Sequence, residues 1–176
     1  MIIVMGLPGA GKTTVLKGLK TDYRILNYGD LMLEIEKEHF GVKDRDDMRK
    51  LPIEKQKQAQ KMVYEKLSQE QGKFILDTHC SVNTPKGFFP GLPFDYLKML
   101  KVDAVVLITA DPKEVAKRRA SDPTRKRDAD DIFLHDNLNK SYLAAYSAFT
   151  GAPAIVILNQ QGKLEEAVAR LQSILV

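Results

Sequence analysis

The sequence predicts an α/β fold built on a mainly parallel sheet, and two observations support this prediction. Five short apolar segments recur along the chain, each rich in β-branched residues, and none alternates with polar residues as a strand with one solvated face does. Helical patterns lie between these segments, and strands that alternate with helices form right-handed βαβ units with parallel strands. The expected strands are residues 2–5, 24–26, 74–76, 104–108 and 154–158.

Apolar residues at helical spacing predict the helices. Such residues share one face within residues 59–67, 138–149 and 164–175. A further helix is expected to begin at residues 111–114, where Asp caps, Pro takes the first helical position and Glu follows three residues after the cap. Ligands of such a fold bind beyond the carboxyl ends of the strands, so the segments after the strands are the candidate site.

Two stretches do not fit the alternation of strands and helices. Residues 78–94 contain three prolines and two glycines, and residues 121–131 are polar and dense in charge. Both are expected to be long loops, which in a compact chain are usually functional or mobile.

Length, composition and charge bound the class of protein. A chain of 176 residues with 44% hydrophobic and 28% charged residues is expected to form a single domain over residues 1–176. Its 27 basic and 23 acidic residues give a net charge of +4, too small to argue for nucleic acid as a partner.

No apolar run approaches the roughly 18 residues of a membrane span, and no basic leader precedes the first strand, so we expect a cytoplasmic protein. The single cysteine, Cys80, is expected to be a buried or bystander thiol without metal partners.

Residues 6–13, GLPGAGKT, match the phosphate-binding motif G-x-x-x-x-G-K-[ST] at every position, between an apolar strand and a helix expected at 14–20. Glycines permit backbone angles that a Cβ forbids, so successive N–H groups can point into one concavity that favours phosphate. Lys12 is expected to reach the β- and γ-phosphates of a nucleotide, and the Thr13 hydroxyl to bind Mg²⁺. The alternative is a glycine-rich turn with a surface lysine. The motif does not decide whether the γ-phosphate goes to water or to an acceptor.

A basic run at residues 117–127 holds six basic residues and one acidic residue. The structural alternative is a solvated helix end, because cations suit helix C-termini. The run follows the fourth expected strand, however, and phosphoryl transfer needs cations around the transferring oxygens. We therefore expect a segment that closes over phosphates and excludes water.

Other candidate residues follow the third strand and the second helical region. Asp77 ends the third strand, where a carboxylate commonly holds Mg²⁺ or its waters, the alternative being a cap of the next turn. His79 is either a site residue or a hydrogen-bonded structural histidine. In residues 44–52, Arg45 and Arg49 are either ion-paired surface residues or a source of bidentate phosphate recognition.

With these residues assembled, the chain resembles the archaeal type of adenylate kinase, a branch of the P-loop nucleoside monophosphate kinases, along nearly its whole length. DTH at 77–79, TPKGFFPGLP at 84–93 and RRASDPTRKRD at 118–128 are more specific to this family than the phosphate motif. Further landmarks are NYGDLM at 27–32, DRDDMRKLP at 44–52, DIFLH at 131–135 and YSAFTGAPAIVILN at 146–159.

The resemblance implies a P-loop nucleotide-kinase fold with five parallel strands in the order 2-3-1-4-5, helices on both faces, a monophosphate-binding helical region at 28–72 and a short lid at 118–131. It implies reversible Mg²⁺-dependent phosphoryl transfer from ATP to AMP, giving two ADP, in a homotrimer. The catalytic residues would be Lys12, Asp77, Arg119, Arg125 and Arg127. The ATP site would comprise Gly6, Pro8, Gly9, Ala10, Gly11, Lys12, Thr13, Thr14, Arg118 and Asn159; the AMP side Gly29, Asp30, Arg49, His79 and Lys86; and the Mg²⁺ site Thr13 and Asp77, partly through water.

Three positions depart from the family pattern. Lys140 follows Asn139 where the family usually has arginine, Asp30 stands where archaeal members often have an uncharged residue, and Leu33 where most other adenylate kinases have arginine. These departures affect the prediction of which nucleoside monophosphate is the acceptor, so a kinase of CMP or UMP is the first alternative. The second is an ATPase acting on RNA or ribosomal particles, which need not carry residues 44–52 or an arginine-rich lid, and the third is a non-catalytic nucleotide sensor.

Overall fold

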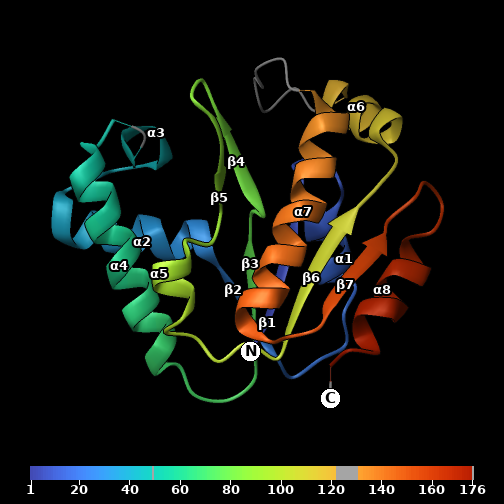
Figure 1. Ribbon diagram of the computed structural model, residues 1–176, viewed down its shortest axis with the longest axis horizontal. Coiled ribbons are helices and arrows are strands. Elements are labelled where there is room, and N and C mark those ends of the chain that lie inside the picture. Colours follow the sequence, from blue (N-terminus) through green and yellow to red (C-terminus); the bar gives the residue numbers. More distant parts are fainter. Residues whose placement is uncertain (49, 122–130, 176) are drawn as a thin grey trace.

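The computed structural model describes residues 1–48, 50–121 and 131–175. Its centre is a parallel sheet of five strands in the order β2-β3-β1-β6-β7, which confirms the predicted strand order (Figure 1). Along the sheet, Ile2 pairs with Ile75 on one side and with Ala104 on the other. The strands are β1 (Ile2–Gly6), β2 (Arg24–Asn27), β3 (Phe74–Thr78), β6 (Ala104–Thr109) and β7 (Ala154–Leu158).

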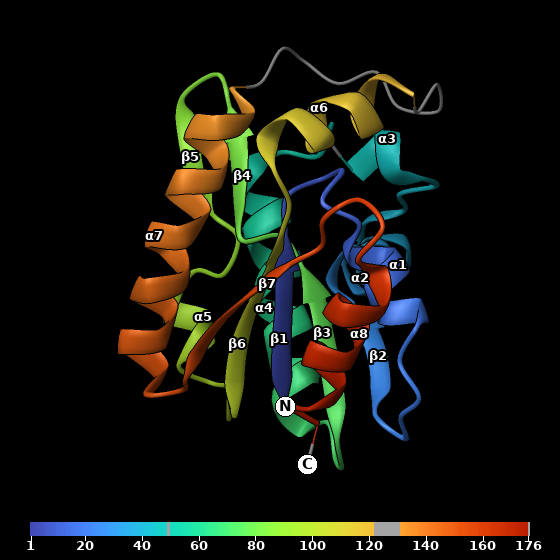
Figure 2. The ribbon, with the colours of Figure 1, turned by 90° about the vertical axis from the view of Figure 1, so that its right-hand side faces the viewer.

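Helices cover both faces of this sheet, as predicted. The described residues form the helices α1 (Lys12–Lys17), α2 (Tyr28–Phe40), α3 (Arg45–Met48), α4 (Ile53–Gln69), α5 (Phe94–Leu97), α6 (Pro112–Ala120), α7 (Ile132–Thr150) and α8 (Leu164–Gln172). Figure 2 shows α7 on one side of the sheet and α1 and α8 on the other.

The apolar core is divided by the sheet into two clusters, because successive residues of a strand point to opposite faces. Ile3 and Met5 of β1 pack with buried residues of α2, α4 and α7. Ile2 and Val4 pack with buried residues of α1 and α8. The fully buried strands therefore read as continuous apolar runs, which is the pattern that predicted them.

A β-hairpin replaces part of the long loop that we expected at residues 78–94. It consists of β4 (Ser81–Thr84) and β5 (Gly87–Pro90), with Val82 opposite Phe89. Gly87, with φ of +110°, makes the tight reversal possible. Pro90 is the last residue of β5, where the missing N–H costs little. The expected loop was therefore wrong over the residues of the hairpin, because prolines and glycines are typical of irregular chain. Pro85 lies in the turn of the hairpin, Pro90 at the end of β5, and Pro93 caps α5 (Phe94–Leu97).

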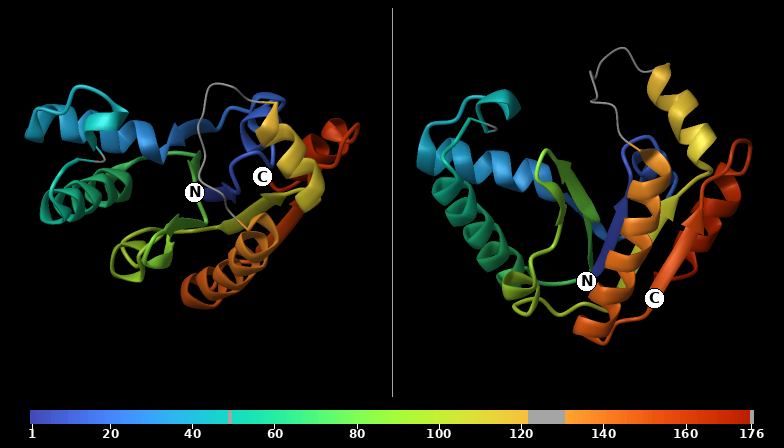
Figure 3. Two further views of the ribbon diagram at one scale, coloured as in Figure 1. Left: turned by 90° about the horizontal axis from the view of Figure 1, so that it is seen from above. Right: turned by 45° about the horizontal axis from the view of Figure 1, so that its top comes forward.

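All five strands of the sheet end at the same edge, and the segments that follow them gather there. Figure 3 shows α2, α3 and α4 on one side of this edge, and α6 and α7 on the other. The expected start of α6 is confirmed, because Asp111 Oδ1 accepts a hydrogen bond from the Lys113 N–H at 2.8 Å. Of the residues described, none belongs to a helix with the length and apolar character that crossing a membrane requires.

Candidate active site

The phosphate-binding loop lies between β1 and α1, and its glycines are required for two different reasons. Gly9 and Gly11 have φ of +92° and +83°, in the left-handed region that other residues rarely adopt. Gly6 is required by space, because a Cβ built on it would lie 2.6 Å from the Ile108 carbonyl oxygen of β6. Gly6 is therefore required where the end of β1 lies against the neighbouring strand β6.

Side chains from two later segments hold the carbonyl groups of this loop. Arg119 Nε donates to the Pro8 carbonyl at 2.8 Å, and Asn159 Nδ2 donates to the Ala10 carbonyl at 2.9 Å. In a trans peptide the C=O and the following N–H point in opposite directions. The N–H groups after Pro8 and Ala10, those of Gly9 and Gly11, are therefore turned away from Arg119 and Asn159, as a phosphate cradle requires.

Arg118 links these two supports. Its guanidinium donates to the Ala10 carbonyl at 3.4 Å and to the Asn159 carbonyl at 2.9 Å, and it pairs with Glu114 at 3.0 Å. The Glu114 carboxylate also accepts a hydrogen bond from the Gln161 N–H at 2.8 Å. The start of the basic run is therefore built into the wall of the loop, which rules out the solvated helix end for Arg118.

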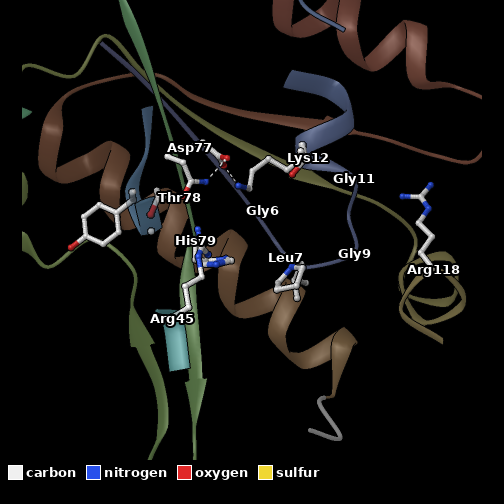
Figure 4. A pocket seen from close by; sticks show the side chains of 15 residues that line it. Gly6, Leu7, Gly9, Gly11, Lys12, Arg45, Asp77, Thr78, His79 and Arg118 are labelled. Atoms are coloured by element: carbon white, nitrogen blue, oxygen red, sulfur yellow. Dashed lines mark hydrogen bonds and ion pairs between the residues drawn. The ribbon is translucent and has the colours of Figure 1, made fainter. Parts of the chain in front are cut away.

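Lys12 and Asp77 form an ion pair at the carboxyl edge of the sheet, shown by the dashed line in Figure 4. Asn27 Nδ2 donates to the other carboxylate oxygen of Asp77 at 2.9 Å. The same Asn27 side chain accepts from the Asp30 N–H at 3.1 Å and so caps α2. Burial lowers the pKa of Lys12 to about 8, because the charged ammonium loses water contacts.

These groups line a cleft of about 400 Å³ at the carboxyl edge of the sheet, where ligands of parallel sheets bind. One wall is the phosphate-binding loop, a second comes from the start of α2 and from α3, and a third from the end of β3. Among the described lining residues, Lys12, Arg45 and Arg118 outnumber the one carboxylate, that of Asp77, which suits phosphate groups. The lining consists of Gly6, Leu7, Pro8, Gly9, Gly11, Lys12, Thr13, Asn27, Tyr28, Gly29, Arg45, Asp77, Thr78, His79 and Arg118.

Most of the predicted site residues are brought together in this cleft. Ten of them line it: Gly6, Pro8, Gly9, Gly11, Lys12, Thr13, Gly29, Asp77, His79 and Arg118. Ala10, Asn159 and Arg119 stand behind it and support the loop. Thr14 begins the helical hydrogen bonding of α1, with its N–H donating to the Gly11 carbonyl at 3.0 Å.

The remaining predicted residues lie elsewhere. Asp30 pairs with Arg45, whose guanidinium lines the cleft. Lys86 is in the turn of the β4–β5 hairpin and does not line the cleft. Arg49, Arg125 and Arg127 lie outside the described residues. Their roles, like that of Lys86, stay predictions.

Sequence reasoning missed Asn27 as a site residue, and of the two arginines weighed in residues 44–52 it assigned only Arg49 to the AMP side. Arg45 was weighed beside Arg49 in the same segment, but a periodicity argument cannot decide which side a four-residue helix presents. Asn27 ends β2, next to the strand that ends in Asp77 and Thr78. The rule that parallel strands place ligands at their carboxyl ends is the signal that would have found it.

The donor set fits Mg²⁺ in part. Magnesium prefers oxygen ligands and usually keeps several waters while binding one or two protein groups and substrate phosphates. The Thr13 hydroxyl and the Asp77 carboxylate line the same cleft and match that requirement. Within the described part of the chain, no three or more His, Cys, Asp or Glu side chains are grouped as metal ligands, so a cage made of protein alone is not found there.

Comparison with known proteins now decides the family. A family model described as "AAA domain" matches residues 5–133. The chain is 42% identical over 182 residues to an adenylate kinase of Methanothermobacter thermautotrophicus, covering 99% of this chain and 98% of the relative. It is 44% identical over 179 residues to an adenylate kinase of Methanopyrus kandleri, covering 96% and 93%. The chain belongs to the adenylate kinase family.

The fold of this adenylate kinase family member is shared more widely. The crystal structure of a shikimate kinase from Bacteroides thetaiotaomicron matches with a TM-score of 0.59, covering 98% of this chain and 96% of that one. At 16% identity the likeness concerns the fold alone.

Lys140 is one of the three positions at which the sequence departs from the expected family pattern. Its Nζ lies 2.6 Å from Asp136 Oδ2, one turn earlier on α7. It is not among the residues that line the cleft. No contact with the cleft therefore links this departure to the choice of monophosphate.

Proposed function

We propose that the protein catalyses reversible phosphoryl transfer from Mg·ATP to AMP, giving two molecules of ADP. The observation that carries this proposal is a single cleft lined both by the phosphate-binding loop and by Arg45, a cation on a different element. Hydrolysis of ATP uses water as the acceptor and needs no cation for a second phosphate group, whereas a phosphate-bearing acceptor needs its own cationic partner. The names of the relatives support the choice of an adenylate acceptor.

The donor side of the cleft is assigned to ATP. The N–H groups of Gly9 and Gly11 would bind phosphate oxygens, while Lys12 would move from Asp77 to the β- and γ-phosphates. Thr13 and Asp77 would hold Mg²⁺, which when bound neutralises charge on those phosphates. Arg118 and Arg119 would keep the loop in shape, and Arg125 and Arg127 would complete the lid.

The acceptor side is assigned to AMP. Arg45 and His79 line the cleft beside Gly29, and Asp30 holds the Arg45 guanidinium by an ion pair. Arg49 and Lys86 stay assigned to this side by resemblance. An acceptor phosphate is already ionised, so the protein has no proton to remove with a strong base. Its residues act by positioning the two nucleotides and by neutralising charge.

The experiment is an acceptor panel with purified protein and Mg·ATP. The acceptors are AMP, CMP, UMP and GMP, with one reaction that has none, and the products are separated by chromatography. Two ADP per AMP consumed, with little turnover in the other reactions, is the expected result. A preference for CMP or UMP would change the acceptor but keep the class. ADP and free phosphate without any acceptor would favour the ATPase that acts on RNA or ribosomal particles.

We also propose that the protein assembles as a homotrimer, as the resemblance implies. An exposed apolar surface supports self-association. Val156 and Leu158 of the edge strand β7 are 46% and 56% exposed. Phe94 and Phe149 stack with ring centroids 4.5 Å apart and are 42% and 44% exposed. Light scattering of the protein as it elutes from a size-exclusion column would measure the mass of the assembly. We also propose a cytoplasmic location, which cell fractionation would test.

A further inference from the structure

A buried carboxylate on α7 has no part in the function proposed above. Asp136 is 5% exposed. One of its oxygens accepts a hydrogen bond from the Thr109 hydroxyl, and the other pairs with Lys140 at 2.6 Å. Burying a carboxylate is costly unless it is paired and hydrogen-bonded, and Asp136 has a partner for each of its two oxygens.

Thr109 connects this carboxylate to the segment after β7. It is the last residue of β6 and is 2% exposed. Its hydroxyl donates to Asp136, while its carbonyl accepts a hydrogen bond from the Asn159 N–H at 2.7 Å. Side chain and backbone of one residue are therefore fixed from two different elements.

Asn159 connects Thr109 to the phosphate-binding loop. Its Nδ2 donates to the Ala10 carbonyl at 2.9 Å, and its carbonyl accepts from Arg118. Contact with the loop is close, because a Cβ on Gly11 would lie 2.2 Å from Asn159 Nδ2. A small displacement of Asn159 would therefore displace the loop or break its hydrogen bond.

We infer that Asp136 is a positioning residue for the nucleotide donor, acting through Thr109 and Asn159 on the phosphate-binding loop. Within the described part of the chain, its hydrogen bond and ion pair join it to Thr109 and Lys140, neither of which lines the cleft, so its effect is expected to be selective for the donor. The hydrogen-bonded connection runs from Asp136 to Thr109, from the Thr109 carbonyl to Asn159, and from Asn159 to Ala10. This inference rests on the proposed binding of ATP at that loop.

The test uses two substitutions of Thr109 with opposite expected results. Thr109→Val keeps the shape of the side chain but removes the hydroxyl, whereas Thr109→Ser keeps the hydroxyl but removes a methyl group. Equilibrium binding is measured by titration calorimetry, once with a non-hydrolysable ATP analogue and once with AMP. Because neither titration requires turnover, a failure of the proposed reaction does not affect the result.

We expect Thr109→Val to raise the Kd of the ATP analogue about three- to tenfold and to leave the Kd of AMP within about twofold. Thr109→Ser should bind both ligands like the unmodified protein. Ser147→Ala is the matched control, since it removes a 2.7 Å hydrogen bond to Ala152 at the other end of α7 and should change neither Kd.

Three outcomes would overturn the inference: unchanged binding in Thr109→Val, equal weakening of both ligands, or a Thr109→Ser variant as weak as Thr109→Val. The last outcome would show that packing of the Thr109 methyl group, and not its hydroxyl, determines the affinity for the ATP analogue. If Thr109→Val does not fold, as judged by circular dichroism, Asp136→Ala decides the question. A weaker ATP analogue with AMP unaffected supports the inference, and any other result in that variant refutes it.

Discussion

Lys12 and Asp77 form an ion pair between the start of α1 and the end of β3, with Asn27 holding the second oxygen of the carboxylate. An incoming phosphate would compete with Asp77 for the ammonium. The ion pair therefore holds the Lys12 side chain in the cleft before a nucleotide binds. When the ammonium moves to the phosphates, the Asp77 carboxylate would become available to Mg²⁺.

Replacement of Lys12 by alanine should reduce kcat/KM for transfer by about a hundredfold or more, because the cation on the β- and γ-phosphates is lost. The measurement is initial rates with ATP and AMP. Lys17→Ala is the control, since Lys17 is an exposed residue in the last turn of the same helix. Full activity of the Lys12 variant would disprove the assignment of the loop.

The pH dependence follows from the pKa of Lys12, which burial lowers to about 8 in the unliganded protein. Below that pH the side chain is a cation and can bind phosphate; above it the charge is lost. We expect kcat/KM for ATP to fall as pH rises above 8, approaching about tenfold for each further pH unit. In Lys12→Arg the side chain stays charged, so its profile should be flat between pH 8 and 9.5. An equally flat profile in the unmodified protein would contradict this prediction.

Arg45→Ala should raise the KM for AMP about tenfold and the KM for ATP less than about twofold, since Arg45 lines the acceptor side of the cleft. Kinetics at varied AMP and then varied ATP measure both values. Lys50→Ala, which removes an exposed cation paired with Asp47, should leave both unchanged. Arg49→Ala is expected to follow Arg45→Ala. A larger effect on ATP in either arginine variant would move that residue to the donor side.

Gly6→Ala should lower the free energy of unfolding by about 1–3 kcal/mol and weaken ATP binding, because the added Cβ would collide with the Ile108 carbonyl. Urea unfolding and titration with ATP measure the two effects. The control is Gly41→Ala, at which φ is +68° and, apart from the neighbouring residues of the chain, no atom of the described residues lies within 4 Å of the added Cβ. It should destabilise through the backbone alone, with ATP binding preserved. Normal ATP binding by Gly6→Ala would show that the loop keeps its function when the backbone moves to make room for the added Cβ.

Lys140→Arg should change kcat/KM by no more than about twofold. Arginine can keep the ion pair that Lys140 makes with Asp136, and Lys140 does not line the cleft. Steady-state rates with both nucleotides test this expectation. A marked loss of activity would mean that the surroundings of Asp136 are shaped around lysine.

The strands and the phosphate-binding loop were predictable because their signals are local. A run such as Ala104–Ile108 is apolar at every position, and the motif at 6–13 fixes both residue type and spacing. The β4–β5 hairpin was not predictable in the same way. Its prolines and glycines are typical of irregular loops, and only the pairing of Val82 with Phe89 shows that the two strands lie in register.

The candidate site was predictable where one residue follows a strand directly, as Asp77 does. It was less predictable where contacts join distant segments. The direction of the Arg45 side chain depends on how α3 packs beside α2, and no pattern in residues 44–52 contains that information. The link from Asp136 to Thr109 is a tertiary contact over 27 residues in sequence, so it has no local signal.

The supports of the phosphate-binding loop have a consequence for the order in which the protein is made. Residues 6–13 leave the ribosome early, whereas Arg118, Arg119 and Asn159 follow more than a hundred positions later. A nascent chain that ends before β7 contains the whole motif but lacks the amide that holds the Ala10 carbonyl. We therefore expect a nascent chain to bind nucleotide tightly only near the end of synthesis, after the sheet has received its last strand.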